Sequence, residues 1–225
     1  MTSIKMFRRF TPLIFGIFFC SSTILGQWTD YGVWSSASIS QKVLDNLDFS
    51  SEVQTRFDHE ASRLSTTFTN LSLSKSLTSN WKLSSTLRLG VTRANDNAFE
   101  PLSRISFSVK HKRTLLTNLA ASVRFRYQLK TDFKQAFRLS PALYYKVSKK
   151  LRLAFYTEFF VRPSLEGLFH SDSRYRFIVK YKVSKRRWVS FGYQIEQQKN
   201  TPDPRTEHVF ICSYDMEMKR RNGKK

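Results

Sequence analysis

The feature that most constrains this chain is a two-residue alternation of apolar and polar side chains, repeated along most of its length. In the segment WKLSSTLRLGVTR (81–93), tryptophan, leucine and valine alternate with lysine, serine, threonine and arginine. Similar alternation runs through 118–130, 136–148, 151–162 and 174–184. Successive side chains of a β-strand point to opposite faces, so a period of two predicts strands with one apolar and one polar face.

Six further segments show the same alternation more weakly, which brings the strand-like segments to about eleven. Many of them run for ten residues or longer. An ordinary globular strand has about five or six residues, whereas a tilted strand that crosses a bilayer needs about 9 to 11. No segment after the N-terminal region has the period of an amphipathic helix. The six weaker segments are Val33 to Lys42, Leu47 to Phe57, Arg63 to Leu73, Ser103 to Lys110, Trp188 to Gln197 and His208 to Met218.

The connections between these segments alternate in length. Short turns on one rim and long loops on the other are typical of bacterial outer-membrane barrels, whose short turns face the periplasm. Single-chain bacterial barrels normally have an even number of strands, whereas about eleven segments are counted in this sequence. We therefore expect an all-β fold, an antiparallel transmembrane β-barrel of 10 to 12 strands. The short connections contain 76–80, 147–150 and 183–187, and the longer ones contain 93–101, 162–172 and 198–207.

The first 26 residues have the layout of a secretory signal peptide. Lys5, Arg8 and Arg9 precede an apolar run from Leu13 to Phe19, and small and polar residues follow up to Gly26. The apolar run is shorter than the roughly 20 residues of a transmembrane helix, so we expect cleavage after Gly26 rather than anchoring. The expected organisation is a signal peptide over 1–26, a β-barrel domain over 27–218 and a basic C-terminal tail over 219–225.

The chain has two cysteines, Cys20 and Cys212. Phe19 stands before Cys20, where a lipid-attachment signal would have a small residue, so we do not expect a lipoprotein. After cleavage only Cys212 remains. A single cysteine excludes an intrachain disulfide and a metal site built from cysteines.

The mature chain is strongly basic. Removal of the signal peptide leaves 35 Lys and Arg residues against 17 Asp and Glu residues, a net charge of +18. Such an excess is often a sign of nucleic-acid binding, but export and the even spread of the charges along the chain argue against that partner. We expect outer-membrane lipid and lipopolysaccharide as partners, together with the barrel assembly machinery. The sequence indicates no oligomeric state.

The strand pattern alone does not say which face of the barrel is apolar. A soluble barrel turns its apolar face inward, whereas a membrane barrel turns it toward lipid and has a polar interior. Strand length, the alternating connections and the signal peptide favour the membrane barrel, and a soluble periplasmic ligand-binding barrel is the alternative. Aromatic residues near strand ends suit the interfacial girdles of a membrane barrel; these are Trp81, Tyr127, Tyr145, Tyr181, Trp188 and Tyr193.

Six short segments occur in an order that is shared with a known family: GVWSSASISQKV (32–43), LDFSSEVQTRF (47–57), RFRYQL (124–129), TEFF (157–160), SRYRF (173–177) and FGYQ (191–194). Together they resemble the family catalogued as domain of unknown function 2490, over nearly the whole mature chain. The resemblance implies an exported β-barrel of a Gram-negative bacterium and implies no chemistry. The chain departs from many barrels at its end, where a basic tail follows Met218 in place of a terminal aromatic residue.

Residues with catalytic or metal-binding chemistry are scattered. His59, His111, His170 and His208 show no spacing that would hold a metal, and motifs for nucleophilic catalysis or nucleotide binding are absent from the sequence. We therefore expect neither a cofactor nor an enzyme. Barrel enzymes assemble their Ser, His and acidic residues from distant strands, so an outer-membrane enzyme that acts on lipid is the alternative.

The polar face carries a cluster of charges that we assign to the lumen. Two interpretations remain open: a lattice of salt bridges that fills a narrow barrel, or a basic pore that favours anions. Within the cluster we expect Glu158 to pair with an arginine of an adjoining strand, either Arg138, Arg174 or Arg176. The predicted lumen charge cluster comprises Arg124, Arg126, Arg138, Arg152, Glu158, Arg162, Arg174, Arg176 and Glu196.

Overall fold

The computed structural model describes residues 28–94, 98–130, 134–164, 167–200 and 204–219. The expected signal peptide therefore lies outside the described residues. No helix in the described part of the chain is long and apolar enough to cross a membrane. The described residues form eleven strands: β1 (Trp28–Leu44), β2 (Leu47–Asp58), β3 (Arg63–Ser76), β4 (Trp81–Arg93), β5 (Phe99–Leu116), β6 (Leu119–Lys130), β7 (Gln135–Lys146), β8 (Leu151–Ser164), β9 (Gly167–Ser184), β10 (Arg187–Gln198) and β11 (Arg205–Glu217).

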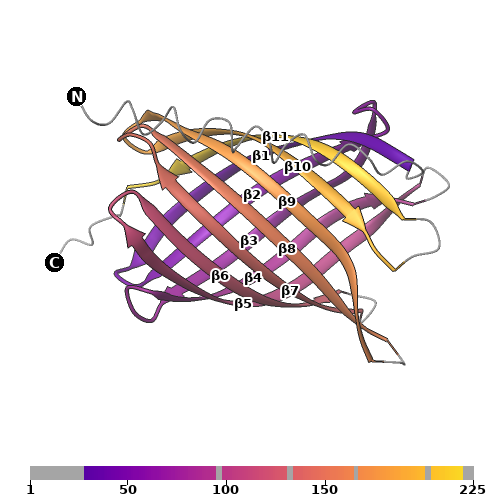
Figure 1. Cartoon of the computed structure of the whole chain (residues 1–225), viewed down its shortest axis with the longest axis horizontal. Coiled ribbons are helices and arrows are strands. Elements are labelled where there is room, and N and C mark those ends of the chain that lie inside the picture. The colour runs from indigo at the N-terminus through magenta and orange to yellow at the C-terminus, as the bar shows by residue number, and fades with distance from the viewer. Residues whose placement is uncertain (1–27, 95–97, 131–133, 165–166, 201–203, 220–225) are drawn as a thin grey trace.

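The strands close into a barrel in which each strand pairs with its neighbours in sequence (Figure 1). Consecutive strands are antiparallel, and β1 closes the barrel by pairing with β11 in parallel. Eleven strands fall within the expected range, but the even number that is normal for a single-chain bacterial barrel is not found. The parallel closure follows from the odd number, because alternating directions make the first and last strands run the same way.

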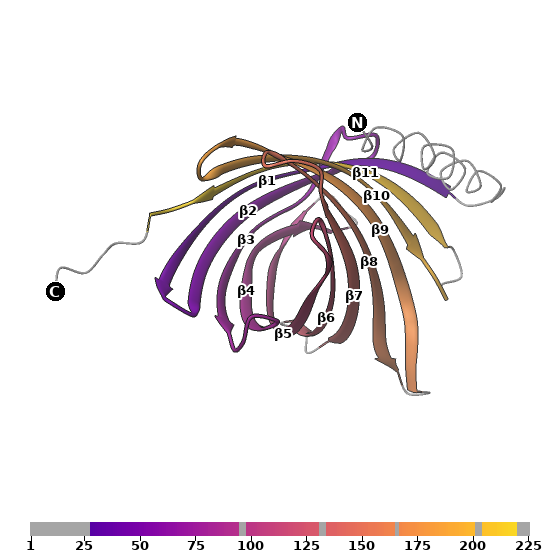
Figure 2. The same ribbon diagram turned by 60° about the vertical axis from the view of Figure 1, so that its left-hand side comes forward.

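The two ends of the barrel differ less in loop length than the sequence predicts. We call one end the turn end, where two to four residues join the strands at 45–46, 77–80, 117–118, 147–150 and 185–186. At the other end, the loop end, two to six residues join them. The long loop expected over 162–172 is wrong, because strand pairing continues through it to Ser164 and resumes at Gly167. As a result the β8–β9 hairpin extends past the neighbouring strands (Figure 2).

The apolar face of the strands points outward. Leu89, Phe125, Leu139 and Phe191 are each about half exposed, at 44 to 59%, and they occupy odd-numbered positions on four different strands. The even-numbered positions of the same strands face the interior, where their polar side chains contact polar side chains of neighbouring strands. An apolar outer face and a polar interior are the arrangement of a membrane barrel, whereas a soluble barrel has the opposite arrangement.

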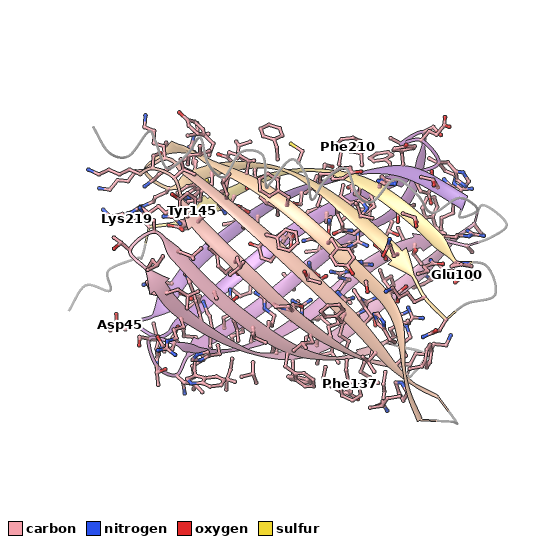
Figure 3. All side chains as sticks on the ribbon, in the orientation of Figure 1. Asp45, Glu100, Phe137, Tyr145, Phe210 and Lys219 are labelled. Carbon is pink, nitrogen blue, oxygen red and sulfur yellow. The ribbon has the colours of Figure 1, made fainter. Side chains whose placement is uncertain are left out.

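Aromatic side chains on the outer face gather near both ends of the barrel. Near the turn end, the rings of Trp81 and His111 are 4.5 Å apart. Near the loop end, the rings of Tyr127 on β6 and Phe137 on β7 are 5.3 Å apart. Figure 3 shows Phe210 and Phe137 pointing away from the barrel on opposite sides.

One of the residues expected in these outer girdles lies elsewhere. Trp188 is on an even-numbered position of β10, is 6% exposed and faces the interior. The guanidinium of Arg152 lies 4.5 Å from the centre of its ring. The expectation was wrong because position along the strand, rather than apolar character, decides which face a side chain takes.

Candidate functional site: the barrel lumen

One half of the inner face is lined by small hydroxyl side chains. They come from every second position of β1 to β5 and of β11, and many pair with one another across neighbouring strands. Ser72 is 2.8 Å from Thr86, and Ser74 donates to Ser84 at 3.1 Å. Side chains this small leave space in the barrel centre. The hydroxyl residues that line this space are Ser36, Ser50, Ser72, Ser74, Ser84, Thr86, Ser106, Ser108 and Ser213.

The other half of the inner face is basic, and it extends from β5 to β9. The same two-residue period that turns leucine and phenylalanine outward turns arginine and lysine inward on these strands. All nine residues of the predicted lumen charge cluster occupy inward-facing positions. They do not form one group, because Arg152 lies toward the turn end beside Trp188 while Arg162 lies at the loop end beside Asp172.

Three ion pairs involve members of the predicted cluster. Arg174 Nη2 lies 2.6 Å from Glu196 Oε1, and both side chains are about 14% exposed. Arg162 Nη2 lies 3.0 Å from Asp172 Oδ2. Asp172 was missed because 162–172 was expected to be a loop, whereas strand pairing sets Asp172 opposite Phe160, in phase with Arg174.

Glu158 lies among arginines of both adjoining strands. Its Oε2 is 4.0 Å from Arg138 Nη1, and its Oε1 accepts a hydrogen bond from Ser140 at 3.3 Å. Arg174 stands directly opposite Glu158 in the β8–β9 register, although its ion pair is with Glu196. Arg138 is therefore the arginine that the structure pairs with Glu158.

Sequence reasoning missed a chain of stacked arginine and aromatic side chains around the interior. Arg56 lies 3.8 Å from the centre of the Trp34 ring and 5.0 Å from that of Phe68. On the far side of Phe68, Arg88 lies 3.6 Å from the ring centre. In the other direction, Arg174 lies 5.6 Å from Trp34. We call the whole set the arginine–aromatic belt; its members are Arg88, Phe68, Arg56, Trp34, Arg174, Phe160 and Arg138.

The aromatic members of the belt hold the guanidinium groups where hydrogen-bond partners are few. Among the described residues, the Nε atoms of Arg56, Arg138 and Arg174 are buried without a hydrogen-bond partner. A desolvated cation over an aromatic face gains about 2 kcal/mol. The sequence did carry a signal for this belt, since Trp34, Phe68 and Phe160 are apolar residues at positions of the polar face.

Around the belt the lumen is open. A cavity of about 350 Å³ lies on its loop-end side and one of about 430 Å³ on its turn-end side. The two cavities share Arg56, Arg88, Arg104, Arg138 and Arg174 in their walls, so the belt and its neighbours separate them. A third cavity of about 460 Å³ opens at the turn end. The inner side chains thus leave open volume both above and below the belt.

A serine and a histidine meet on β9 in a way that bears on the enzyme alternative. Ser173 Oγ is 3.0 Å from His170 Nε2, but Ser173 is fully buried. The neighbouring carboxylate of Asp172 binds Arg162 and accepts a hydrogen bond from Ser171, and it makes no contact with the imidazole that would complete a triad. Among the described residues, no group of three or more His, Cys, Asp or Glu side chains is placed to hold a metal ion.

The closed barrel with a polar interior has the fold of a porin. It is similar to a solved structure described as NanC porin, with a TM-score of 0.56 and 10% sequence identity, over 84% of this chain and 99% of that one. The chain belongs to the family described as protein of unknown function DUF2490, whose profile matches residues 31–207. No curated protein matches the chain.

Proposed function

We propose that this protein is an outer-membrane barrel, exported by a cleaved signal peptide, whose lumen is a narrow pore that favours anions. The observation that carries the proposal is the open volume on both sides of a belt of inward-facing arginines. A lumen filled by a salt-bridge lattice would leave no such volume.

The charges of the lumen determine whether it favours anions or cations. Among the described residues, eleven basic side chains, including Arg56, Arg88 and Arg104, line the two cavities that flank the belt, against five carboxylates. Rings of basic side chains attract anions and repel cations in a narrow pore, and the low-dielectric wall strengthens the effect. A small inorganic anion therefore meets a favourable potential along the lumen.

The outer face supports the membrane location. Exposed apolar side chains cover the middle of the strands, aromatic side chains lie near both ends, and the fold is that of a porin. Outer-membrane lipid, lipopolysaccharide and the barrel assembly machinery are the partners that this location implies. In the orientation of known barrels the turn end faces the periplasm.

The test is the conductance of the purified mature protein in a planar lipid bilayer. We expect small conductance steps, and a reversal potential in a potassium chloride gradient with the sign of chloride selectivity. Replacement of the belt residue Arg88 by Gln should reduce that selectivity, whereas replacement of the outward-facing Arg113 by Gln should not. A protein that inserts without conducting, or that prefers potassium, would contradict the proposal and favour a purely structural barrel.

A further inference from the structure

The inner faces of β4 to β7 place basic residues directly opposite one another. Like charges that face each other across a strand pair destabilise a sheet. Strand register brings together Lys82 with Lys110, Arg88 with Arg104, Arg104 with Lys130, Lys110 with Arg124, and Arg126 with Arg138. The repetition of this costly arrangement on adjacent strands requires an explanation.

In the described part of the chain, carboxylates of the interior compensate two members of these pairs: Asp48 on β2 binds Lys82 at 2.6 Å, and Glu158 on β8 lies 4.0 Å from Arg138. Glu196 binds Arg174 at 2.6 Å, and Asp215 binds Lys180 at 2.5 Å. Glu196 and Asp215 lie on β10 and β11, on the other side of the barrel from β6. β6 and β7 contain no acidic residue, and β5 contains only Glu100, near the loop end.

We call Arg104, Lys110, Arg124, Arg126 and Arg138 the basic wall. Four of the five, all except Lys110, line the cavity of about 430 Å³, and the hydroxyl side chains of β1 to β4 line its other side. Alternate residues of a strand are about 6.6 to 6.8 Å apart and neighbouring strands are about 4.8 Å apart. The basic wall is therefore a two-dimensional array of cationic groups that faces an open space.

We propose that the basic wall binds an extended solute that carries two or more anionic groups. This inference deepens the proposed function and rests on it to the extent that the solute must enter the lumen. An anionic group between two facing cations accepts charge-assisted hydrogen bonds from both and removes their repulsion. A single such group compensates one pair, whereas an extended ligand with several groups compensates pairs on successive strands at once.

The test uses inorganic tripolyphosphate as the extended probe and orthophosphate as the single-group probe, measured by titration calorimetry on the full mature protein in detergent. We expect tripolyphosphate to bind more tightly than orthophosphate. The double variant Arg124→Gln/Arg126→Gln should weaken tripolyphosphate binding at least about tenfold, because charge-assisted hydrogen bonds to two cations are lost. Lys42→Gln removes a charge from β1, on the opposite side of the barrel, and should leave binding unchanged.

A structural role for the basic wall predicts a different pattern. If Arg124 and Arg126 belonged to a stabilising lattice, their replacement would lower the temperature at which the barrel unfolds in detergent. We expect that temperature to be unchanged or raised, because repulsion is relieved. If the double variant failed to assemble, that failure would itself overturn the proposal. A lower unfolding temperature of the single variant Arg126→Gln would then confirm that the basic wall stabilises the barrel.

The outcomes separate this inference from the pore proposal. Chloride selectivity together with equal tripolyphosphate affinity in the parent and the double variant would overturn the inference and leave the pore. Tripolyphosphate binding that depends on Arg124 and Arg126, in a protein without conductance, would support the inference and overturn the pore. Equal affinity for tripolyphosphate and orthophosphate would overturn the requirement for an extended ligand.

Discussion

The guanidinium of Arg56 on β2 lies 3.8 Å from the centre of the Trp34 ring on β1, and the ring is 4% exposed. The contact joins the first two strands inside the barrel, beside the parallel pairing of β1 with β11 that closes it. Trp34 is also within 5.6 Å of Arg174, which belongs to β9 on the other side of that closure. A single aromatic ring thus connects the strands on both sides of the closing seam.

We expect Trp34→Ala to destabilise the barrel strongly. Truncation of a buried tryptophan costs about 3 to 5 kcal/mol, and the loss of a desolvated cation–π contact adds about 2 kcal/mol. Trp81→Ala, on the outer face where the ring is 45% exposed, is the matched control and should cost less. Urea unfolding in lipid vesicles measures both. Equal losses would mean that the burial and the cation–π contacts of Trp34 contribute no more than a ring on the outer face does.

Gly90 on β4 makes room for the arginine–aromatic belt. A Cβ atom at this position would lie 2.2 Å from the Thr67 carbonyl oxygen and 2.5 Å from the Phe68 Cα atom, both of them backbone atoms. Gly90→Ala should therefore impair assembly or lower the unfolding temperature, since β3 would have to move. Gly167→Ala meets no atom within 4 Å, although its φ of 121° is unfavourable for alanine. If Gly90→Ala assembles like the parent, the close approach of β3 and β4 is not required.

The sequence predicts the strands and their faces well, because a period of two specifies both at once. It assigns Arg124, Arg126, Arg174 and Arg176 to the interior, where the structure places them. It does not predict the arginine–aromatic belt, since the approach of Trp34 to a residue of β9 depends on how the barrel closes. The count of about eleven strand-like segments is compatible with a parallel pairing of β1 with β11, but the even number that is normal for single-chain barrels argued against it.

The error at Trp188 has a related cause. Apolar character suggested an outer position, while the alternation of β10 placed the ring on the inner face, which also carries the buried Ser190 and Gln194. The loop expected over 162–172 was wrong because the polar character of this stretch does not prevent strand pairing. Backbone pairing of Pro163 with Leu168 continues through it.

Neighbouring residues on β9 should respond in opposite ways to substitution. Val179 faces outward, so Val179→Arg places a charge in hydrocarbon at a cost of about 2 to 4 kcal/mol near the membrane midplane. Lys180→Ala removes an ion pair with Asp215 whose side chains are 35% and 30% exposed, which costs about 1 kcal/mol or less. Heat modification on gels compares the two variants. If the Val179→Arg variant resisted heat while the Lys180→Ala variant did not, the inner and outer faces assigned to β9 would be the wrong way round.

We expect the mature protein to begin at Gln27 and to fractionate with the outer membrane. The basic, apolar and polar order of residues 1–26 is that of a cleaved leader. N-terminal sequencing of the purified protein and density-gradient fractionation of cell envelopes test the two statements separately. Recovery in the soluble periplasmic fraction would contradict the membrane location, and an intact Met1 in the membrane fraction would contradict cleavage alone.

The last prediction concerns Glu158, whose carboxylate lies between Ser140 and Arg138 on the basic side of the lumen. Glu158→Gln keeps the shape and a hydrogen-bond acceptor but leaves Arg138 without its ion pair. Breaking a buried pair by removing one charge costs about 3 to 5 kcal/mol, because the orphaned charge stays buried. We therefore expect a lower heat-modification temperature and, since a negative charge leaves the lumen, a stronger preference for anions.

Glu100→Gln is the control for Glu158→Gln. Glu100 is an exposed carboxylate at the loop end of β5, far from Asp45 and Lys219 at the turn end (Figure 3). Glu100→Gln removes the same charge without breaking a buried pair. The stability of the barrel should therefore be unchanged, and its preference for anions should change less than in Glu158→Gln. Unchanged stability and conductance in Glu158→Gln would mean that this carboxylate is solvated, and that the ion pair with Arg138 does not order the lumen.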